Sequence, residues 1–281
     1  MQREVRAIHP ALEAHMPGLS TWQALPNRGV EYLDPFLLLN HHGPENFPPQ
    51  NQGLPFGPHP HRGFETLTFI FDGDLVHKDS TGHVSEMGPG GVQWMTAGKG
   101  IIHSEVSSDA FKEKGGREEV LQLWMNLPRK LKDVEPDYHG YPAETLRTID
   151  LETQVKLHLI SGPYQGQQGP HQSLTGLWLA YADMQRGSMW TWEVPEGRNV
   201  FLYVVSGALT VNGHQAPMRH LVEMGTKGTL VELMSTEPGT RLILGHGAVI
   251  DEPKAAQGPF VMNYPGEIKQ AWLDYQAGKF A

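Results

Sequence analysis

The stretch GPHPHRGFETLTFIFDG, residues 57–73, joins a pair of histidines to an apolar run with strand character. Alternate side chains of a β-strand lie on one face, so His59 and His61 point the same way and the proline between them points away. Because proline is confined to strand ends, edges and bulges, we expect the pair near a strand end. The same parity continued past Gly63 places the odd-numbered residues from Glu65 to Phe71 on the histidine face. This predicts a barrel with polar groups at its mouth and an apolar wall.

A second pair with the same spacing follows in TAGKGIIHSEV, residues 96–106, where His103 and Glu105 stand at i and i+2. A single His-x-His pair also occurs by chance on polar loops, whereas two such pairs on two strands of a small barrel can converge on one point. Together they offer three imidazoles and one carboxylate, a donor set that suits iron, nickel, copper or zinc. Since the chain has no cysteine, a closed structural zinc site is the less favoured alternative.

Short apolar runs separated by turn residues extend over most of the chain, which contains 32 glycines and 22 prolines. This pattern predicts an all-β fold of sandwich or barrel type. One helix is expected at the end, in GEIKQAWLDYQAGKF (266–280), where Ile268, Trp272 and Tyr275 form an apolar stripe. We expect this helix to pack on the last barrel.

An internal repeat predicts two β-units. Residues 65–83 resemble residues 199–215 at an offset of 134, and residues 86–94 resemble residues 223–231 at an offset of 137. The first offset carries His59 onto Glu193 and His61 onto Pro195, so the second unit has lost the histidine pair. We therefore expect an N-terminal metal-binding domain over 1–135. A C-terminal domain over 136–281 would lack metal ligands and carry the helix.

Composition limits the classes of partner. The chain has 281 residues, with 22 Lys and Arg against 31 Asp and Glu, and its formal charge is −9. A chain with this acidic balance does not attract the phosphate backbone of a nucleic acid. No apolar run is long enough to span a bilayer, and the first residues, MQREVRAIHP, lack the apolar core of a secretory signal. We expect a soluble cytoplasmic protein without direct nucleic-acid or membrane contacts.

Four blocks of the sequence resemble the pirin family, a branch of the bicupin superfamily: PHPHRGFETLTFIFDG, GPGGVQWMTAGKGIIHSE, LWMNLP and GPFVMN, in this order along the chain. The resemblance implies two jelly-roll-like cupin barrels in tandem. It also implies one Fe(II) per chain in the N-terminal barrel, with other divalent transition metals as alternatives, and the ligands His59, His61, His103 and Glu105.

The acidic ligand has an alternative. The wider cupin pattern, His-x-His-x3-Glu, nominates Glu65 instead of Glu105. An extended strand from His61 to Glu65 would cover about 13 Å, which is too far for a shared ion unless Gly63 bends the chain. We therefore prefer Glu105 as the ligand and keep Glu65 as a residue beside the site.

Two functions follow from the resemblance. In the first the protein is a quercetinase-type flavonol 2,4-dioxygenase, and Glu105, as ligand and nearby base, accepts the proton of the substrate hydroxyl. In the second it is a redox-sensing iron protein that acts by binding a transcription regulator or a metabolic enzyme. Both require a metal that changes valence, and the sequence does not choose between them.

Overall fold

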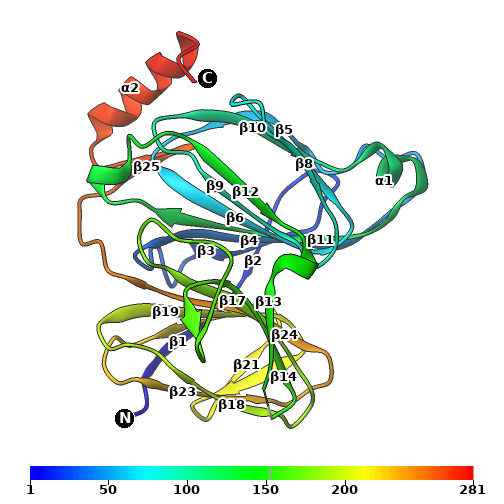
Figure 1. Cartoon of the computed structure of the whole chain (residues 1–281), viewed down its shortest axis with the longest axis vertical. Coiled ribbons are helices and arrows are strands. Elements are labelled where there is room, and N and C mark those ends of the chain that lie inside the picture. The colour runs from blue at the N-terminus through cyan, green and yellow to red at the C-terminus, as the bar shows by residue number, and fades with distance from the viewer. Residues whose placement is uncertain (152, 281) are drawn as a thin grey trace. The chain divides into compact units, whose positions relative to one another are not determined.

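The structure is a computed structural model that describes residues 1–151 and 153–280, and antiparallel β-strands dominate it (Figure 1). Two large sheets, one of seven strands and one of four, make up each of two barrels. The expected all-β architecture of two barrels with a short C-terminal helix is confirmed. Within the described residues, no helix has the length and apolar character needed to cross a membrane.

The N-terminal barrel contains the histidine pair. The strand order of its larger sheet is β12 (Asp137–Tyr141), β9 (Val92–Thr96), β6 (Phe64–Asp72), β11 (Gly116–Asn126) and β4 (Phe36–Phe47), continued by β3 (Thr21–Leu25) and β2 (Leu12–Ala14). The order of its smaller sheet is β5 (Phe56–His61), β10 (Ile101–Val106), β7 (Leu75–Asp79) and β8 (Val84–Met87).

The C-terminal barrel repeats this plan. The strand order of its larger sheet is β1 (Val5–Pro10), β22 (His220–Met224), β19 (Arg198–Ser206), β24 (Thr240–Ala248), β17 (Trp178–Met184), β14 (Val155–Ser161) and β13 (Arg147–Leu151). The smaller sheet is β18 (Met189–Glu193), β23 (Leu230–Ser235), β20 (Ala208–Val211) and β21 (His214–Pro217).

The remaining elements are short. They are the ribbons β15 (Pro163–Tyr164) with β16 (Gln167–Gln168) and β25 (Ala255–Gln257) with β26 (Phe260–Met262), the helices α1 (Asp109–Lys114) and α2 (Pro265–Gln276), and the 3-10 turns η1 (Arg129–Leu131) and η2 (Ala143–Thr145).

The interiors of the two barrels differ in polarity. In the C-terminal barrel one apolar cluster fills the space between the sheets, with Trp190 and Trp192 from the smaller sheet and Leu202 and Leu244 from the larger one. Burying this apolar surface stabilises the barrel by roughly 25 cal/mol per Å² removed from water. In the N-terminal barrel buried hydroxyl, amide and carboxylate groups lie between the sheets, and the site described below is built from them.

Strand order shows which segments of the two barrels correspond. β6 and β19 hold the same place in their sheets, and the offset of 134 carries Phe64–Asp72 onto Arg198–Ser206, so this half of the repeat is confirmed. The second match, residues 86–94 against 223–231, is wrong, because it pairs strands that do not hold the same place in the two barrels. It sets β8, from a four-stranded sheet, against β22, from a seven-stranded sheet. Both segments read Glu-Met-Gly at a strand end, and this local likeness does not report strand order.

Tertiary contacts divide the chain into two compact units that differ from the expected 1–135 and 136–281. One unit comprises residues 1–13, 22–35 and 145–249, and the other comprises 14–21, 36–144 and the described residues from 250 onward. The start of the chain belongs to the first unit because β1 pairs with β22 and extends the larger sheet of the C-terminal barrel. The end belongs to the second because the backbone of Val261 donates to the carbonyl of Arg62 at 3.0 Å.

The C-terminal helix α2 therefore lies in the unit of the N-terminal barrel, and the expectation that it packs on the last barrel is wrong. Its first turn is closed by Glu267, whose carboxylate accepts the backbone N–H groups of Asn263 and Tyr264 at 2.9 Å each. Ile268 is buried against Phe260, whereas Trp272, expected in the apolar stripe, is partly exposed.

Candidate metal centre

Strands β5 and β10 bring three imidazoles together. Their antiparallel register sets His103 directly opposite His59, and His61 shares the face of His59. The ring centroids lie 4.4 Å apart for His59 and His103, 4.7 Å for His59 and His61, and 4.9 Å for His61 and His103. One nitrogen from each ring lies within 4.8 Å of the others, a spacing that can hold one metal ion.

Backbone carbonyls orient two of these rings. His59 donates from Nδ1 to the carbonyl of Gly57 at 2.8 Å, and His61 donates from Nδ1 to the carbonyl of Pro259 at 3.3 Å. A carbonyl only accepts, so each ring carries its proton on Nδ1 and presents the lone pair of Nε2. A carbonyl that fixes the tautomer in this way is the usual neighbour of a metal-binding histidine.

Buried nitrogens without partners mark the same place. Nε2 of His61 and both ring nitrogens of His103 are buried and make no hydrogen bond within the described chain. Such groups are rare in folded proteins, because an unpaired buried polar atom costs free energy. An ion at the common point of the rings would satisfy them, and this is the structural observation that fits a metal.

Burial also keeps these rings neutral. Desolvation, followed by the nearby His59, lowers the pKa of His61 to about 3. Desolvation, followed by repulsion from His61, His59 and His77, lowers the pKa of His103 well below the usual histidine value. Neutral imidazoles are the form that binds metals, so both rings are ready to act as ligands at neutral pH.

Glu105 is buried two residues beyond His103 on β10, and three side chains hold its carboxylate. Oε1 accepts a hydrogen bond from the hydroxyl of Thr68 at 3.0 Å and another from the amide of Gln93, and Oε2 accepts one from the amide of Gln122 at 2.6 Å. These donors come from β6, β9 and β11 of the larger sheet. They fix the orientation of the carboxylate inside the barrel.

The four residues expected as ligands are divided between two groups that overlap at His103. The ligating atoms of His59, His61 and His103 make one cluster, and those of His77, His103 and Glu105 make a second cluster that shares His103. A β-bulge between His103 and Glu105 shifts the register with β5. On the other side of β10, Glu105 lies directly opposite His77 of β7.

Sequence reasoning missed His77. Its Nε2 lies 2.9 Å from the buried carboxylate of Asp79, its ring stacks on Tyr138 at 4.0 Å, and its Nδ1 is buried without a hydrogen bond within the described residues. The available signal was a third i, i+2 pair, His77 with Asp79, which repeats the spacing of His103 with Glu105. Its relevance depends on β7 lying beside β10.

Glu65 belongs to neither cluster. Its Oε1 accepts from the indole of Trp94 at 3.0 Å and from the hydroxyl of Thr96 at 2.8 Å. Burial is the main cause that raises the pKa of Glu65 to about 7. Its partners lie on β9 at positions that alternate with Gln93, which reaches Glu105 instead, so Glu65 faces away from the histidines.

The expected parity of β6 is therefore wrong. Gly63 has φ of +88°, a left-handed conformation that separates β5 from β6 and resets the alternation. The even-numbered residues of β6 face the site: the ring of Phe64 lies 5.1 Å from that of His61, and Thr68 reaches Glu105. The wall beside the cluster is consequently polar, with hydroxyl and amide groups, and becomes aromatic next to His61.

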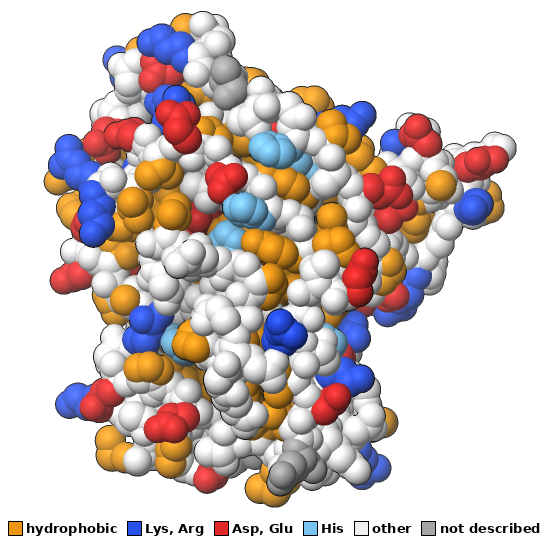
Figure 2. All heavy atoms as spheres, viewed as in Figure 1, with side chains coloured by type: hydrophobic (Ala, Val, Ile, Leu, Met, Phe, Trp, Pro, Cys, Tyr) orange, Lys and Arg blue, Asp and Glu red, His pale blue; other side chains and the backbone are white. Residues whose placement is uncertain are grey.

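The surface around the site is mixed in charge. On the face shown in Figure 2 histidine side chains reach the surface over β10 and β12, and basic and acidic side chains are interspersed around them. His59 is the member of the first cluster that is partly exposed, whereas His61 and His103 are buried. The cluster can therefore be approached from the side of His59.

Known proteins resemble this chain over most of its length. A family model described as Pirin matches residues 18–125, and one described as Pirin C-terminal cupin domain matches residues 179–281. A protein of Pseudomonas aeruginosa named putative quercetin 2,3-dioxygenase is 38% identical over 89% of this chain and 87% of its own.

Solved structures extend the likeness to the fold. The crystal structure of a quercetin 2,3-dioxygenase from Acinetobacter baumannii superposes with a TM-score of 0.94 at 33% identity, over 100% of this chain and 99% of that one. The bacterial pirin YhhW from Escherichia coli, solved in complex with nickel(II), shares the fold with a TM-score of 0.65 at 20% identity, over 86% of this chain and 99% of that one.

Proposed function

This chain belongs to the pirin family, and we propose that it is a metal-dependent dioxygenase of flavonol-type substrates. The observation that carries the proposal is the set of converging imidazoles whose buried nitrogens have no partner within the described residues. The names of the relative and of the solved structure above supply the substrate class.

Fe(II) is the metal we propose, held by His59, His61, His103 and Glu105. Nitrogen and carboxylate donors without thiolates suit iron and nickel, and the nickel(II) complex of YhhW supports a metal site in this fold. The two overlapping clusters leave His103 as the residue common to every arrangement. When bound, a metal ion such as Fe(II), which can change its oxidation state, would supply Lewis acidity and electron transfer to dioxygen.

The chain's own residues would bind the substrate and accept one proton from it. The aromatic rings of Phe64 and Trp124, which contact each other at 4.4 Å and His61 at 5.1 Å each, offer an apolar wall for a planar ring system. Glu105 is the only ionisable carboxylate in either cluster and would accept the proton of the substrate hydroxyl. Thr68, Gln93 and Gln122 would hold the carboxylate in position during that transfer.

Oxygen consumption by purified, iron-loaded protein with quercetin tests this function. We expect saturable turnover that His103→Ala abolishes and His214→Ala, at an exposed histidine of the C-terminal barrel, leaves unchanged. Absence of turnover in the fully loaded protein would contradict the enzyme function. It would favour the second function, a redox-sensing iron protein that binds a transcription regulator or a metabolic enzyme.

A further inference from the structure

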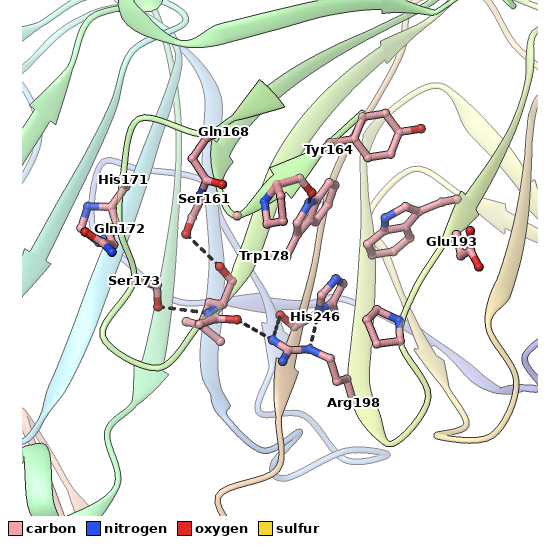
Figure 3. A pocket seen from close by; sticks show the side chains of 16 residues that line it. Ser161, Tyr164, Gln168, His171, Gln172, Ser173, Trp178, Glu193, Arg198 and His246 are labelled. Atoms are coloured by element: carbon pink, nitrogen blue, oxygen red, sulfur yellow. Dashed lines mark hydrogen bonds between the residues drawn. The ribbon is translucent and has the colours of Figure 1, made fainter. Parts of the chain in front are cut away.

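A pocket of about 520 Å³ opens in the C-terminal barrel, at the position that corresponds to the metal site. The offset of 134 carries His59 and His61 onto Glu193 and Pro195, and both line this pocket (Figure 3). Its volume lies within the range of roughly 300–1,000 Å³ typical of small-molecule sites. The positions that carry the histidine pair in the N-terminal barrel therefore line a pocket in the C-terminal barrel, beside its apolar core.

Aromatic rings form one side of the pocket. The indoles of Trp178 and Trp192 lie 5.0 Å apart, and the ring of His246 stacks on Trp178 at 5.6 Å with an angle of 9°. His246 also stacks on Trp192 at 5.7 Å. Both indoles are almost fully buried, and Trp178 is held in place by its hydrogen bond to the carbonyl of Pro163 at 2.9 Å. Rigid faces of this kind favour a planar aromatic ligand.

The protonation of His246 is fixed by Arg198. Nε of Arg198 donates to Nδ1 of His246 at 2.7 Å, so Nδ1 accepts and the proton of the neutral ring lies on Nε2 (Figure 3). Burial, followed by the charges of Arg198 and Arg3, lowers the pKa of His246 to about 3 and keeps the ring neutral. His246 therefore offers an N–H donor that makes no hydrogen bond within the described chain.

Arg198 brings a positive charge without a counter-charge. Its terminal nitrogen donates to the carbonyls of Gly176 at 2.5 Å and His246 at 3.3 Å, and no carboxylate of the described residues pairs with it. Backbone carbonyls satisfy hydrogen bonds but do not cancel the charge. A half-buried guanidinium usually pairs with a carboxylate or phosphate, because its planar fork matches their geometry.

Arg3 does not line the pocket, but its positive charge acts on His246, which does. Its side chain is 1% exposed and donates only to backbone carbonyls, those of Pro195, Arg198 and Gly225. The carboxylate of Glu196 acts on the charge of Arg3 but forms no ion pair with it within the described residues. Two guanidinium groups and one imidazole N–H thus make this end of the barrel attractive to an anion.

We propose that the pocket of the C-terminal barrel binds a planar aromatic carboxylate, whose ring lies along Trp178 and Trp192 and whose carboxylate meets Arg198 and the Nε2–H of His246. Glu193 is exposed at the mouth and lies away from Arg198, so it disfavours a second negative group at the outer end of the ligand (Figure 3). The proposal is independent of the metal and of the dioxygenase function.

Calorimetric titration of the full-length protein with 2-naphthoate tests the site, with 2-naphthamide as the uncharged probe and 2-naphthylmethylamine as the cationic one. We expect one naphthoate per chain, bound about tenfold or more tighter than either of the other probes. The reason is that only its carboxylate can accept a charge-assisted hydrogen bond from Arg198. Tryptophan fluorescence should change on saturation. Equal affinity of the three probes, or tighter binding of the amine, would overturn the proposal.

Two variants with opposite effects locate the ligand. Arg198→Gln should weaken naphthoate binding roughly tenfold or more, whereas Glu193→Gln should strengthen it by a few-fold through loss of repulsion. Glu193 is exposed, so its variant keeps the test valid if Arg198→Gln fails to fold. His103→Ala in the other barrel should leave the affinity unchanged. Loss of binding in His103→Ala, or weaker binding in Glu193→Gln, would place the ligand elsewhere and reject the site.

Discussion

Strands β5 and β18 hold the same place in their four-stranded sheets, yet they present different chemistry. β5 carries His59 opposite His103 of β10, whereas β18 carries Glu193 opposite Leu230 of β23. The first pairing leaves buried nitrogens in need of a ligand, and the second allows the barrel to fill with apolar side chains. One fold therefore supports either a polar site or an apolar core, depending on a few inward positions.

A buried position of β6 outside both clusters shows a similar contrast. Glu65 of β6 is a buried carboxylate, and the residue at the corresponding position of β19 is Asn199, whose amide donates to the carbonyl of Asp34 at 2.6 Å. A neutral amide is cheaper to bury than a carboxylate. The N-terminal barrel thus retains polar groups that cost stability, as functional sites commonly do.

The largest expected effect concerns metal content. Replacing any one of His59, His61 or His103 with alanine should reduce bound iron from one per chain to a small fraction, because an underligated ion dissociates readily. His214→Ala, at an exposed site of the barrel that lacks the pair, should keep full occupancy. Elemental analysis of the purified variants measures this. Full iron in any of the first three would remove that residue from the ligand set.

The next effect separates the two buried glutamates. Glu105→Gln should lower flavonol turnover per bound iron about a hundredfold or more, since a general base is lost. Glu65→Gln should lower it less than tenfold, because Glu65 faces Trp94 and Thr96 and the glutamine oxygen can accept the same hydrogen bonds. Turnover and iron content are measured side by side. A larger loss in Glu65→Gln would show that the wider cupin ligand pattern applies.

The smallest effect is on stability. Burial raises the pKa of Glu65 from 4.5 to about 7, so the folded protein holds this proton more tightly than the unfolded chain. The associated stabilisation is complete below pH 4.5 and is lost progressively as the pH rises from there through about 7, at a cost on the order of 3 kcal/mol. Glu65→Gln should remove this pH dependence, whereas Glu86→Gln, at an exposed site, should retain it.

Denaturant unfolding of both variants and the wild type across pH 4–8 gives the comparison. Other buried acids, such as Glu118, whose pKa burial and the neighbouring Asp74 raise to about 8, are present in all three proteins and cancel in the differences. Parallel curves for the wild type and Glu65→Gln would show that the pKa of Glu65 is the same in the folded protein as in the unfolded chain.

The sequence by itself determined the class of fold and the residue types of the site. Short apolar runs between turn residues specify strands, and the i, i+2 spacing places His59 with His61, and His103 with Glu105, on shared faces. Both properties are local, because they depend only on alternation along one strand. The loss of the histidine pair in the second barrel was visible from the repeat at an offset of 134, which needs only a comparison of two segments of the sequence.

Only the tertiary structure decided which strands are neighbours and where parity is reset. The pairing of β7 with β10 brought His77 beside Glu105, and the left-handed Gly63 turned Glu65 away from the histidines. The hydrogen bonds that hold Glu105, and the aromatic pocket with Arg198 and His246, likewise join residues far apart in the chain. Such contacts follow from strand order and bulges, which are set by the packing of the whole barrel, and no short segment encodes them alone.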